Sequence, residues 1–195
     1  TPSSGDGNPS LLFGSLYPYA GGWAGNTGYS FKGMLDEIKI YTSALTAEQV
    51  KLDMNQGSSV AYGGTTQEAD DITEGAGAAP VGYWTLDEKT GSSASDTSGN
   101  GNTGNFSNME AEDWQSSGSC KVGACLDFDG ANEYLTVTDA GSSPLDLTNS
   151  GTISVWAKSD RTYPNDTSSN HYRNFVNKSA GGSTTTITYT FHWHG

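Results

Sequence analysis

The sequence predicts an all-β fold with one short helix. Glycine supplies 26 of the 195 residues, which indicates many turns and short strands. Polar and apolar residues alternate in several stretches, as expected for strands with one buried face. These stretches are 35–41, 135–138, 152–157 and 185–193. Only the segment 45–50 carries the signals of a helix start, and the length suits one large β domain or pieces of two.

The clearest alternation lies near the end of the chain. It places Ile187, Tyr189, Phe191 and Trp193 on one face of a strand, and we expect this face to line the core of a sandwich. Two further tryptophans, Trp84 and Trp156, stand within strand patterns. We expect them in the core as well.

The helix prediction depends on the segment Leu45-Thr-Ala-Glu-Gln-Val50. Thr46 is a suitable N-cap, and Gln49, three residues later, completes a capping box. Leu45 and Val50 are spaced as a hydrophobic staple. The helix should span about 47–53, and a helix this short must pack on the sheets to be stable.

The chain divides into three stretches. Residues 1–54 alternate turns and strands and end in the helix. Residues 55–80 are rich in Gly, Ser, Thr and acidic residues, which predicts a flexible acidic linker. Strand-and-turn patterns resume over 81–195.

The net charge of −13 repels nucleic acids and anionic membranes, so neither is an expected partner. The sequence also contains no apolar run long enough to insert into a membrane. An acidic surface suits calcium, which prefers oxygen ligands. It equally suits a soluble, solvated surface.

The two cysteines, Cys120 and Cys125, are separated by four residues. This spacing allows a local structural disulfide, and it is neither a CxxC redox motif nor a zinc site. Two reduced thiols are the alternative. A disulfide favours an oxidising compartment. The numbered chain contains no export signal, so an extracellular or cell-surface location is inferred from composition and the disulfide.

The stretch 31–50, Phe-Lys-Gly-Met-Leu-Asp-Glu-Ile-Lys-Ile-Tyr followed by Thr-Ser-Ala-Leu-Thr-Ala-Glu-Gln-Val, closely resembles the closing segment of laminin-G-like domains. Segments that resemble the opening part of the same family follow later. They are Gly-Tyr-Trp-Thr-Leu-Asp-Glu (82–88), the loop Asp-Thr-Ser-Gly-Asn-Gly-Asn (96–102), Leu-Asp-Phe-Asp-Gly (126–130) and Thr-Ile-Ser-Val-Trp-Ala (152–157). The resemblance implies a concanavalin-like jelly-roll β-sandwich.

The order of these segments is unusual, because the family's ending precedes its beginning. Residues 1–54 can be the C-terminal part of one sandwich and 81–195 the N-terminal part of a second. Alternatively, the two parts complete one sandwich in permuted order. Either way some family strands are absent, which would leave exposed sheet edges. We expect a longer repeat protein, or a neighbouring copy that supplies strands in a filament or tandem array.

A calcium site is expected on the loop 95–104. Asp96, Asn100 and Asn102 offer oxygen ligands on a Gly-rich loop, which suits the loose geometry of Ca²⁺. The resemblance implies a structural calcium here, with help from Asp36 and Glu37. The alternative is a loop of Asx turns without a metal, which the same residues favour.

Carbohydrate binding is a second expectation. Sugars stack on exposed aromatic rings, and Tyr17, Tyr19 and Trp23 lie in a Gly-rich region that is expected to be exposed. The alternative for each of them is packing in the core or at a sheet edge.

No motif indicates a catalytic centre. His192 and His194 share a strand face but have no evident third zinc ligand. Asp36 and Glu37 are strand neighbours, which places them on opposite faces and unsuited to joint acid–base catalysis. The sequence also contains three triplets that could accept glycans. They begin at Asn105, Asn165 and Asn177.

Three functions remain open. The first is a non-catalytic binding or adhesion module of a repeat-containing surface protein, with a glycan or a surface protein as its ligand. The second is a structural subunit of an extracellular filament or stalk. The third is an accessory domain of a secreted glycan-degrading enzyme, whose catalytic domain would lie elsewhere.

Overall fold

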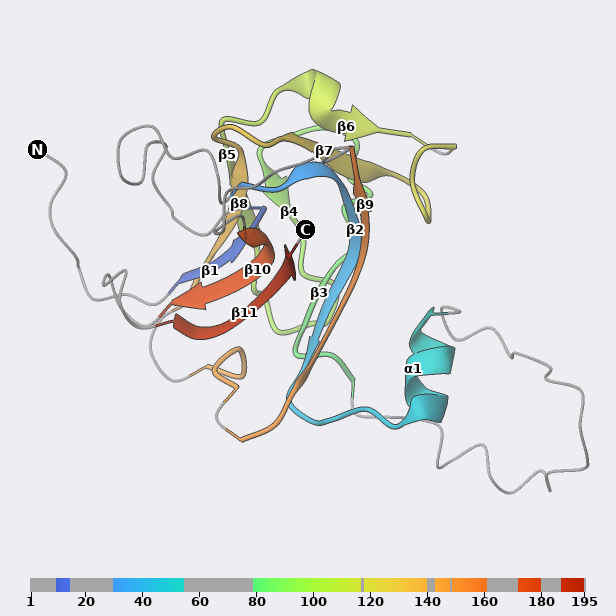
Figure 1. Cartoon of the computed structure of the whole chain (residues 1–195), viewed down its shortest axis with the longest axis vertical. Helices are drawn as coiled ribbons and strands as arrows, with labels where there is room; N and C mark the ends of the chain where they lie inside the picture. The colour runs from blue at the N-terminus through green and yellow to red at the C-terminus, as the bar shows by residue number, and fades with distance from the viewer. Residues whose placement is uncertain are drawn as a thin grey trace, which may run out of the picture.

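The computed structural model describes residues 10–14, 30–54, 79–116, 118–139, 143–147, 149–160, 172–179 and 187–194. Within them the strands form two antiparallel sheets, and the predicted all-β class is confirmed (Figure 1). Sheet A contains, in spatial order, β11 (Ile187–His194), β10 (Tyr172–Ser179), β1 (Ser10–Phe13), β8 (Tyr134–Thr138), β5 (Gly104–Ser107) and β4 (Ser93–Ala94). Sheet B contains β9 (Thr152–Ser159), β2 (Lys32–Tyr41), β3 (Gly82–Trp84), β7 (Cys125–Asp129) and β6 (Trp114–Gln115). A 3-10 turn, η3 (Ala111–Asp113), precedes β6.

The ten-residue strand β2 is the centre of sheet B. One of its edges pairs with β9 along most of its length. The other edge pairs first with β7, through 32–35, and then with β3, through 38–40. In sheet A, β1 lies between β10 and β8. Residues 55–78 lie outside the described residues. Each sheet therefore contains strands that precede these residues and strands that follow them.

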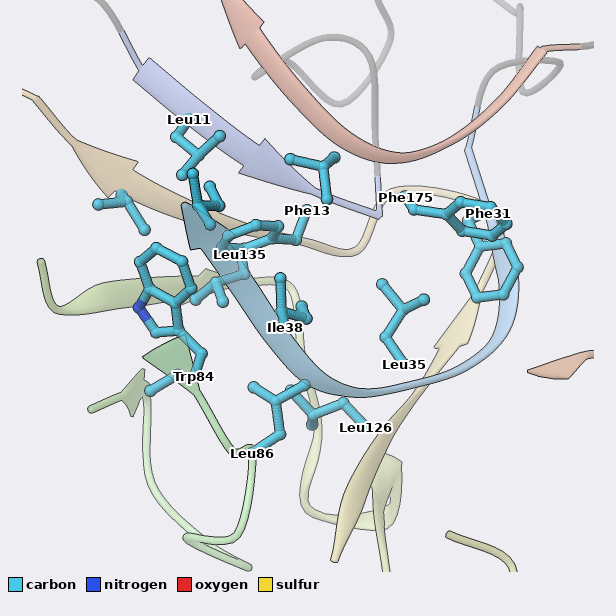
Figure 2. Close-up of a cluster of buried hydrophobic side chains, with 14 of the residues drawn as sticks. Leu11, Phe13, Phe31, Leu35, Ile38, Trp84, Leu86, Leu126, Leu135 and Phe175 are labelled. Carbon is cyan, nitrogen blue, oxygen red and sulfur yellow. The ribbon is translucent and has the colours of Figure 1, made fainter. Parts of the chain in front are cut away.

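The apolar faces of the two sheets enclose one core. Sheet A contributes Phe13 and Leu135, and sheet B contributes Ile38 and Leu126. All four side chains are fully buried. Figure 2 shows these side chains directed into the space between the sheets. The ring of Trp84 packs 4.9 Å from that of Phe13. Burial of this apolar surface is the main force that holds the sheets together.

The alternation of β2 breaks at a bulge. Leu35 and Ile38 both belong to the core, although strict alternation would put positions three apart on opposite faces. The β2–β9 register shifts between Asp36 and Lys39, and Glu37 has a positive φ of 52°. The bulge thus places both Asp36 and Glu37 off the core. The prediction that these two carboxylates point to opposite faces was wrong for this reason.

The helix α1 (Ala47–Met54) forms where it was predicted. The capping box is confirmed, because Thr46 N donates to Gln49 Oε1 over 2.8 Å and Gln49 N donates to Thr46 Oγ1 over 3.3 Å. Val50 is 38 % exposed, and the helix buries no residue fully. Asp53 binds the sheets through polar contacts with Lys39, Tyr41 and Ser154. No helix in the described part of the chain is long and apolar enough to span a membrane.

The aromatic residues follow the predictions in part. Trp84 is fully buried, as expected. Trp156 is only half-buried, on a face where Lys121 Nζ lies 4.3 Å from the centre of its ring, so its assignment to the core was wrong. Tyr189 packs against the core. Phe191 is 40 % exposed because β11 is an edge strand, while the side chains of Ile187 and Trp193 lie outside what the structure describes.

Candidate functional site

The loop 95–104 folds around the carboxylate of Asp96. Its Oδ1 accepts from Tyr83 N over 3.0 Å and from Ser98 N over 2.9 Å. Its Oδ2 accepts from the backbone and side-chain nitrogens of Asn102 over 2.8 and 2.9 Å. Burial alone would raise the pKa of Asp96, but hydrogen bonds from the side chain of Ser98 and from the backbone of Tyr83, Asn102 and Ser98 hold it below its usual value. The carboxylate therefore organises the loop as a set of Asx turns.

The two asparagines of this loop bind the residue directly before β3. The Nδ2 atoms of Asn100 and Asn102 both donate to the carbonyl of Val81, over 3.1 and 2.9 Å. The carbonyl of Asn102 in turn accepts from Trp84 Nε1 over 2.8 Å. These bonds fix the loop to the core. Because the side-chain nitrogens of Asn100 and Asn102 are used in these bonds, the side-chain oxygens of the two residues are the atoms that a cation could bind.

Asp36 lies at the bulge of β2 and binds the disulfide loop. Its Oδ2 accepts from the backbone N–H groups of Lys121 and Val122, each over 2.9 Å. The side chain is 3 % exposed, and burial raises the pKa of Asp36 to about 6, with further increases from the charges of Glu37 and Asp87. Its Oδ1 is buried without a hydrogen-bond partner in the described part of the chain.

The disulfide predicted between Cys120 and Cys125 is confirmed, with the two Cα atoms 5.5 Å apart. Asp87 Oδ1 accepts a hydrogen bond from Ala124 N within the same loop. Asp36 and Asp87 thus both bind backbone N–H groups of the closed loop. Backbone N–H groups that converge in a loop in this way bind anionic oxygens.

Glu37 belongs to a charged cluster beside Asp36. The hydroxyl of Tyr83 donates to Glu37 Oε2. Lys39 Nζ lies 3.7 Å from Glu37 Oε2, 2.8 Å from Asp53 Oδ1 and 4.7 Å from the ring centre of Tyr83. Burial, together with the hydrogen bond to Glu37, raises the pKa of Tyr83. One lysine is thus shared by two carboxylates, Glu37 and Asp53, so the cluster is acidic.

The five residues predicted to bind calcium therefore form two groups. Asp96, Asn100 and Asn102 lie on one loop, and Asp36 and Glu37 lie at the bulge. Tyr83 connects the groups, because its backbone N–H binds Asp96 while its hydroxyl binds Glu37. No set of three or more His, Cys, Asp or Glu side chains in the described ranges is arranged to hold a metal ion.

A groove lies between the two sheets where β9 and β11 form their edges. Its volume is about 400 Å³. Apolar surface comes from Leu147, Ile153, Tyr189 and Phe191, and polar groups come from Asn149, Ser150 and Thr190, with Gly151 completing the wall. Tyr189 is fixed by a hydrogen bond of 3.0 Å from its hydroxyl to the carbonyl of Leu145. The groove therefore combines an exposed aromatic ring with amide and hydroxyl groups.

The predicted sugar-binding and glycosylation residues have different outcomes. Tyr17, Tyr19, Trp23 and Asn165 lie outside the described residues. Asn105 is exposed on β5. Asn177 is fully buried in β10, which leaves no room for a glycan on its side chain in this fold.

Two features of these sites were missed from the sequence. Asp53 connects α1 to the sheets, but the helix pattern gives no sign of what it binds. The groove forms from residues 147, 149–151 and 153 and from 189–191, which the topology brings together. The exposure of Phe191 could have been suspected only if β11 had been recognised as an edge strand.

Comparisons with known proteins identify no relative of this chain, since no family model, no curated protein and no solved structure matches it.

Proposed function

We propose that this chain is a non-catalytic, extracellular binding module with a concanavalin-like jelly-roll fold of the laminin-G type. The strand and loop segments described above carry the resemblance to that family, and the two-sheet architecture is compatible with it. The disulfide between Cys120 and Cys125 supports an oxidising location. The acidic surface argues against nucleic acids as partners.

Carbohydrate is the ligand class that the groove favours. Sugars bind proteins by stacking their apolar faces on aromatic rings, while amides and hydroxyls fix their orientation. Phe191 is 40 % exposed, and Asn149 and Ser150 line the same groove with exposed polar side chains. This juxtaposition is the observation that carries the proposal.

A glycan array tests the proposal directly. The purified chain should bind a defined group of sugars, and Phe191→Ala should lose that signal. Met54→Ala is the matched control, because Met54 is also a large exposed apolar residue, 50 % exposed, on α1 and outside the groove. A folded protein that binds no glycan would contradict the carbohydrate proposal.

Calcium is proposed as a structural ligand of the 95–104 loop and the bulge of β2. The buried, unpartnered Oδ1 of Asp36 and the amide oxygens of Asn100 and Asn102 are the oxygen atoms suited to it. Bound calcium would neutralise part of the acidic cluster and stabilise the loop. Thermal unfolding in calcium and in EDTA tests this, because a ligand of the native state raises the melting temperature. Equal melting temperatures in the two conditions would exclude a stabilising calcium.

A structural role in a filament is the second candidate, and the sheet edges favour it. Among the described strands, β9 pairs only with β2 and β11 pairs only with β10. Eight-residue edge strands of this kind can accept a strand from a neighbouring copy. Negative-stain imaging distinguishes the candidates: regular fibres would support the filament, and dispersed particles would contradict it.

A further inference from the structure

A buried lysine and a buried aspartate meet across β1. Lys178 of β10 is opposite Leu11, and Leu11 is opposite Val137 of β8. Residues directly opposite one another in antiparallel strands share a face, and Leu11 and Val137 belong to the core. Lys178 therefore points between the sheets. Asp139 follows the end of β8, and its Oδ2 is in direct contact with Lys178 Nζ.

Water is excluded from this contact. The side chain of Lys178 is 0 % exposed and that of Asp139 is 2 % exposed. Two full charges in such a place are costly, because the desolvation of each ion competes with their attraction. An amide made from the same two groups carries no charge and suits an apolar surrounding better.

A third group can move the proton. Asp146 Oδ1 lies 3.4 Å from Lys178 Nζ, and the side chain of Asp146 is 31 % exposed, so it can exchange protons with solvent. Both carboxylates act electrostatically on the phenol of Tyr189, whose pKa is raised by burial and, in addition, by the charges of Asp146 and Asp139. A nucleophile precursor, an acceptor carbonyl and a proton acceptor are thus gathered in one place.

We propose that Lys178 and Asp139 join in an intramolecular isopeptide bond. Asp146 accepts a proton from the Lys178 ammonium, and the free amine attacks Cγ of Asp139. The Nζ–Cγ bond forms and one C–O bond of Asp139 breaks. The departing oxygen takes one proton directly from the nitrogen and the other from Asp146, which returns the proton it accepted, and it leaves as water. Nothing is oxidised or reduced, and no co-reactant is needed.

The bond would connect β10 to the end of β8 across β1. It would close a loop between residues 39 positions apart and so restrict the unfolded chain, as a disulfide does. Unlike the disulfide at 120–125, it would survive reducing conditions. It would also join β8 and β10, the two strands that pair with β1. β1 comes from residues 1–54, whereas β8 and β10 come from residues 81–195.

The intact mass of the wild-type chain tests the proposal. After reduction of the disulfide, we expect the mass to be lower than that of the sequence by one water molecule. Trypsin should then release 122–158 joined to 174–195, uncut after Lys178. A full sequence mass, with separate peptides, would overturn the proposal, and this measurement needs no variant.

Variants assign the roles. Lys178→Arg keeps a positive charge opposite Asp139 but has no amine that can attack, so it should show the full sequence mass. Asp146→Asn keeps the shape but cannot accept the proton, so the fraction of linked chain should fall. Full linkage in Asp146→Asn would overturn the role of Asp146. The ion pair of Lys39 and Asp53, 2.8 Å apart, is the internal control, and its peptides should remain unlinked.

Discussion

Lys39 of β2 donates a hydrogen bond to Asp53 of α1 over 2.8 Å, and this contact fastens the helix to sheet B. The same carboxylate accepts from the hydroxyl of Tyr41 over 2.7 Å and from Ser154 Oγ of β9 over 2.7 Å. One side chain thus connects the helix to two strands. Burial alone would raise the pKa of Asp53, but its three donors, Lys39 above all, hold it below its ordinary value.

Replacement of Asp53 should therefore destabilise the protein far more than its place on a short surface helix suggests. Asp53→Ala removes three hydrogen bonds and leaves Lys39, 9 % exposed, with a weaker partner. We expect a loss of about 3 kcal/mol in the free energy of unfolding, measured by urea denaturation. Glu48→Ala, at an exposed position of the same helix, should cost less than about 1 kcal/mol. Equal losses would contradict this role for Asp53.

Gly123 is required by the loop that the disulfide closes. Its φ is +53°, and a Cβ there would lie 2.0 Å from Asp87 Oδ1. Gly123→Ala should cost about 2 kcal/mol, through backbone strain and displacement of Asp87. Gly99→Ala is the matched control, because Gly99 has a φ of +88° with nothing near its Cβ position, and it should cost about 1 kcal/mol from strain alone. A thermal-unfolding series with no difference between the two would contradict the clash with Asp87.

Glu133 should make stability fall as the pH rises. Burial raises its pKa from 4.5 to about 7, and the charges of Asp129 and Asp113 add to this increase. Between pH 4.5 and 7 the native state keeps a proton that the unfolded chain has lost, so its stabilising effect is complete below this range and is lost as the pH rises through it. We expect the wild type to lose about 2 kcal/mol between pH 5 and 8 from this group.

Glu133→Gln mimics the protonated acid and should flatten that loss. Its amide oxygen can still accept the hydrogen bond that Asp129 N donates to Glu133. Urea denaturation at pH 5 and 8 should show the variant more stable than the wild type at pH 8 and close to it at pH 5. A variant with an unchanged pH slope would show that Glu133 is not the group that titrates.

The sequence predicted those parts of the fold that local patterns determine. The strand at 35–41, the capping box of Thr46 and Gln49 and the disulfide all depend on neighbouring residues, and all are confirmed. The bulge at Glu37 was not predictable in this way. A glutamate at positive φ has no local signature. The contacts at the bulge are made with residues far along the chain, since Glu37 binds Tyr83 and Asp36 binds the 121–122 backbone.

The candidate sites were less predictable for the same reason. The 96–102 loop was identified because its residues are contiguous. The groove and the Lys178–Asp139 pair depend on which strands become neighbours, which alternation alone does not specify. Trp156 illustrates the limit: a strand pattern places a residue on one of two faces, and the pattern of β9 does not state which face is the core.

The most direct test of the proposed binding module is the affinity for a glycan selected on the array, measured by titration calorimetry for the wild type, Phe191→Ala and Met54→Ala. The proposal predicts that Phe191→Ala weakens binding at least about tenfold, which corresponds to about 1.4 kcal/mol, while Met54→Ala binds as the wild type does. Unchanged affinity in Phe191→Ala, with the fold intact, would show that the groove between β9 and β11 is not the binding site.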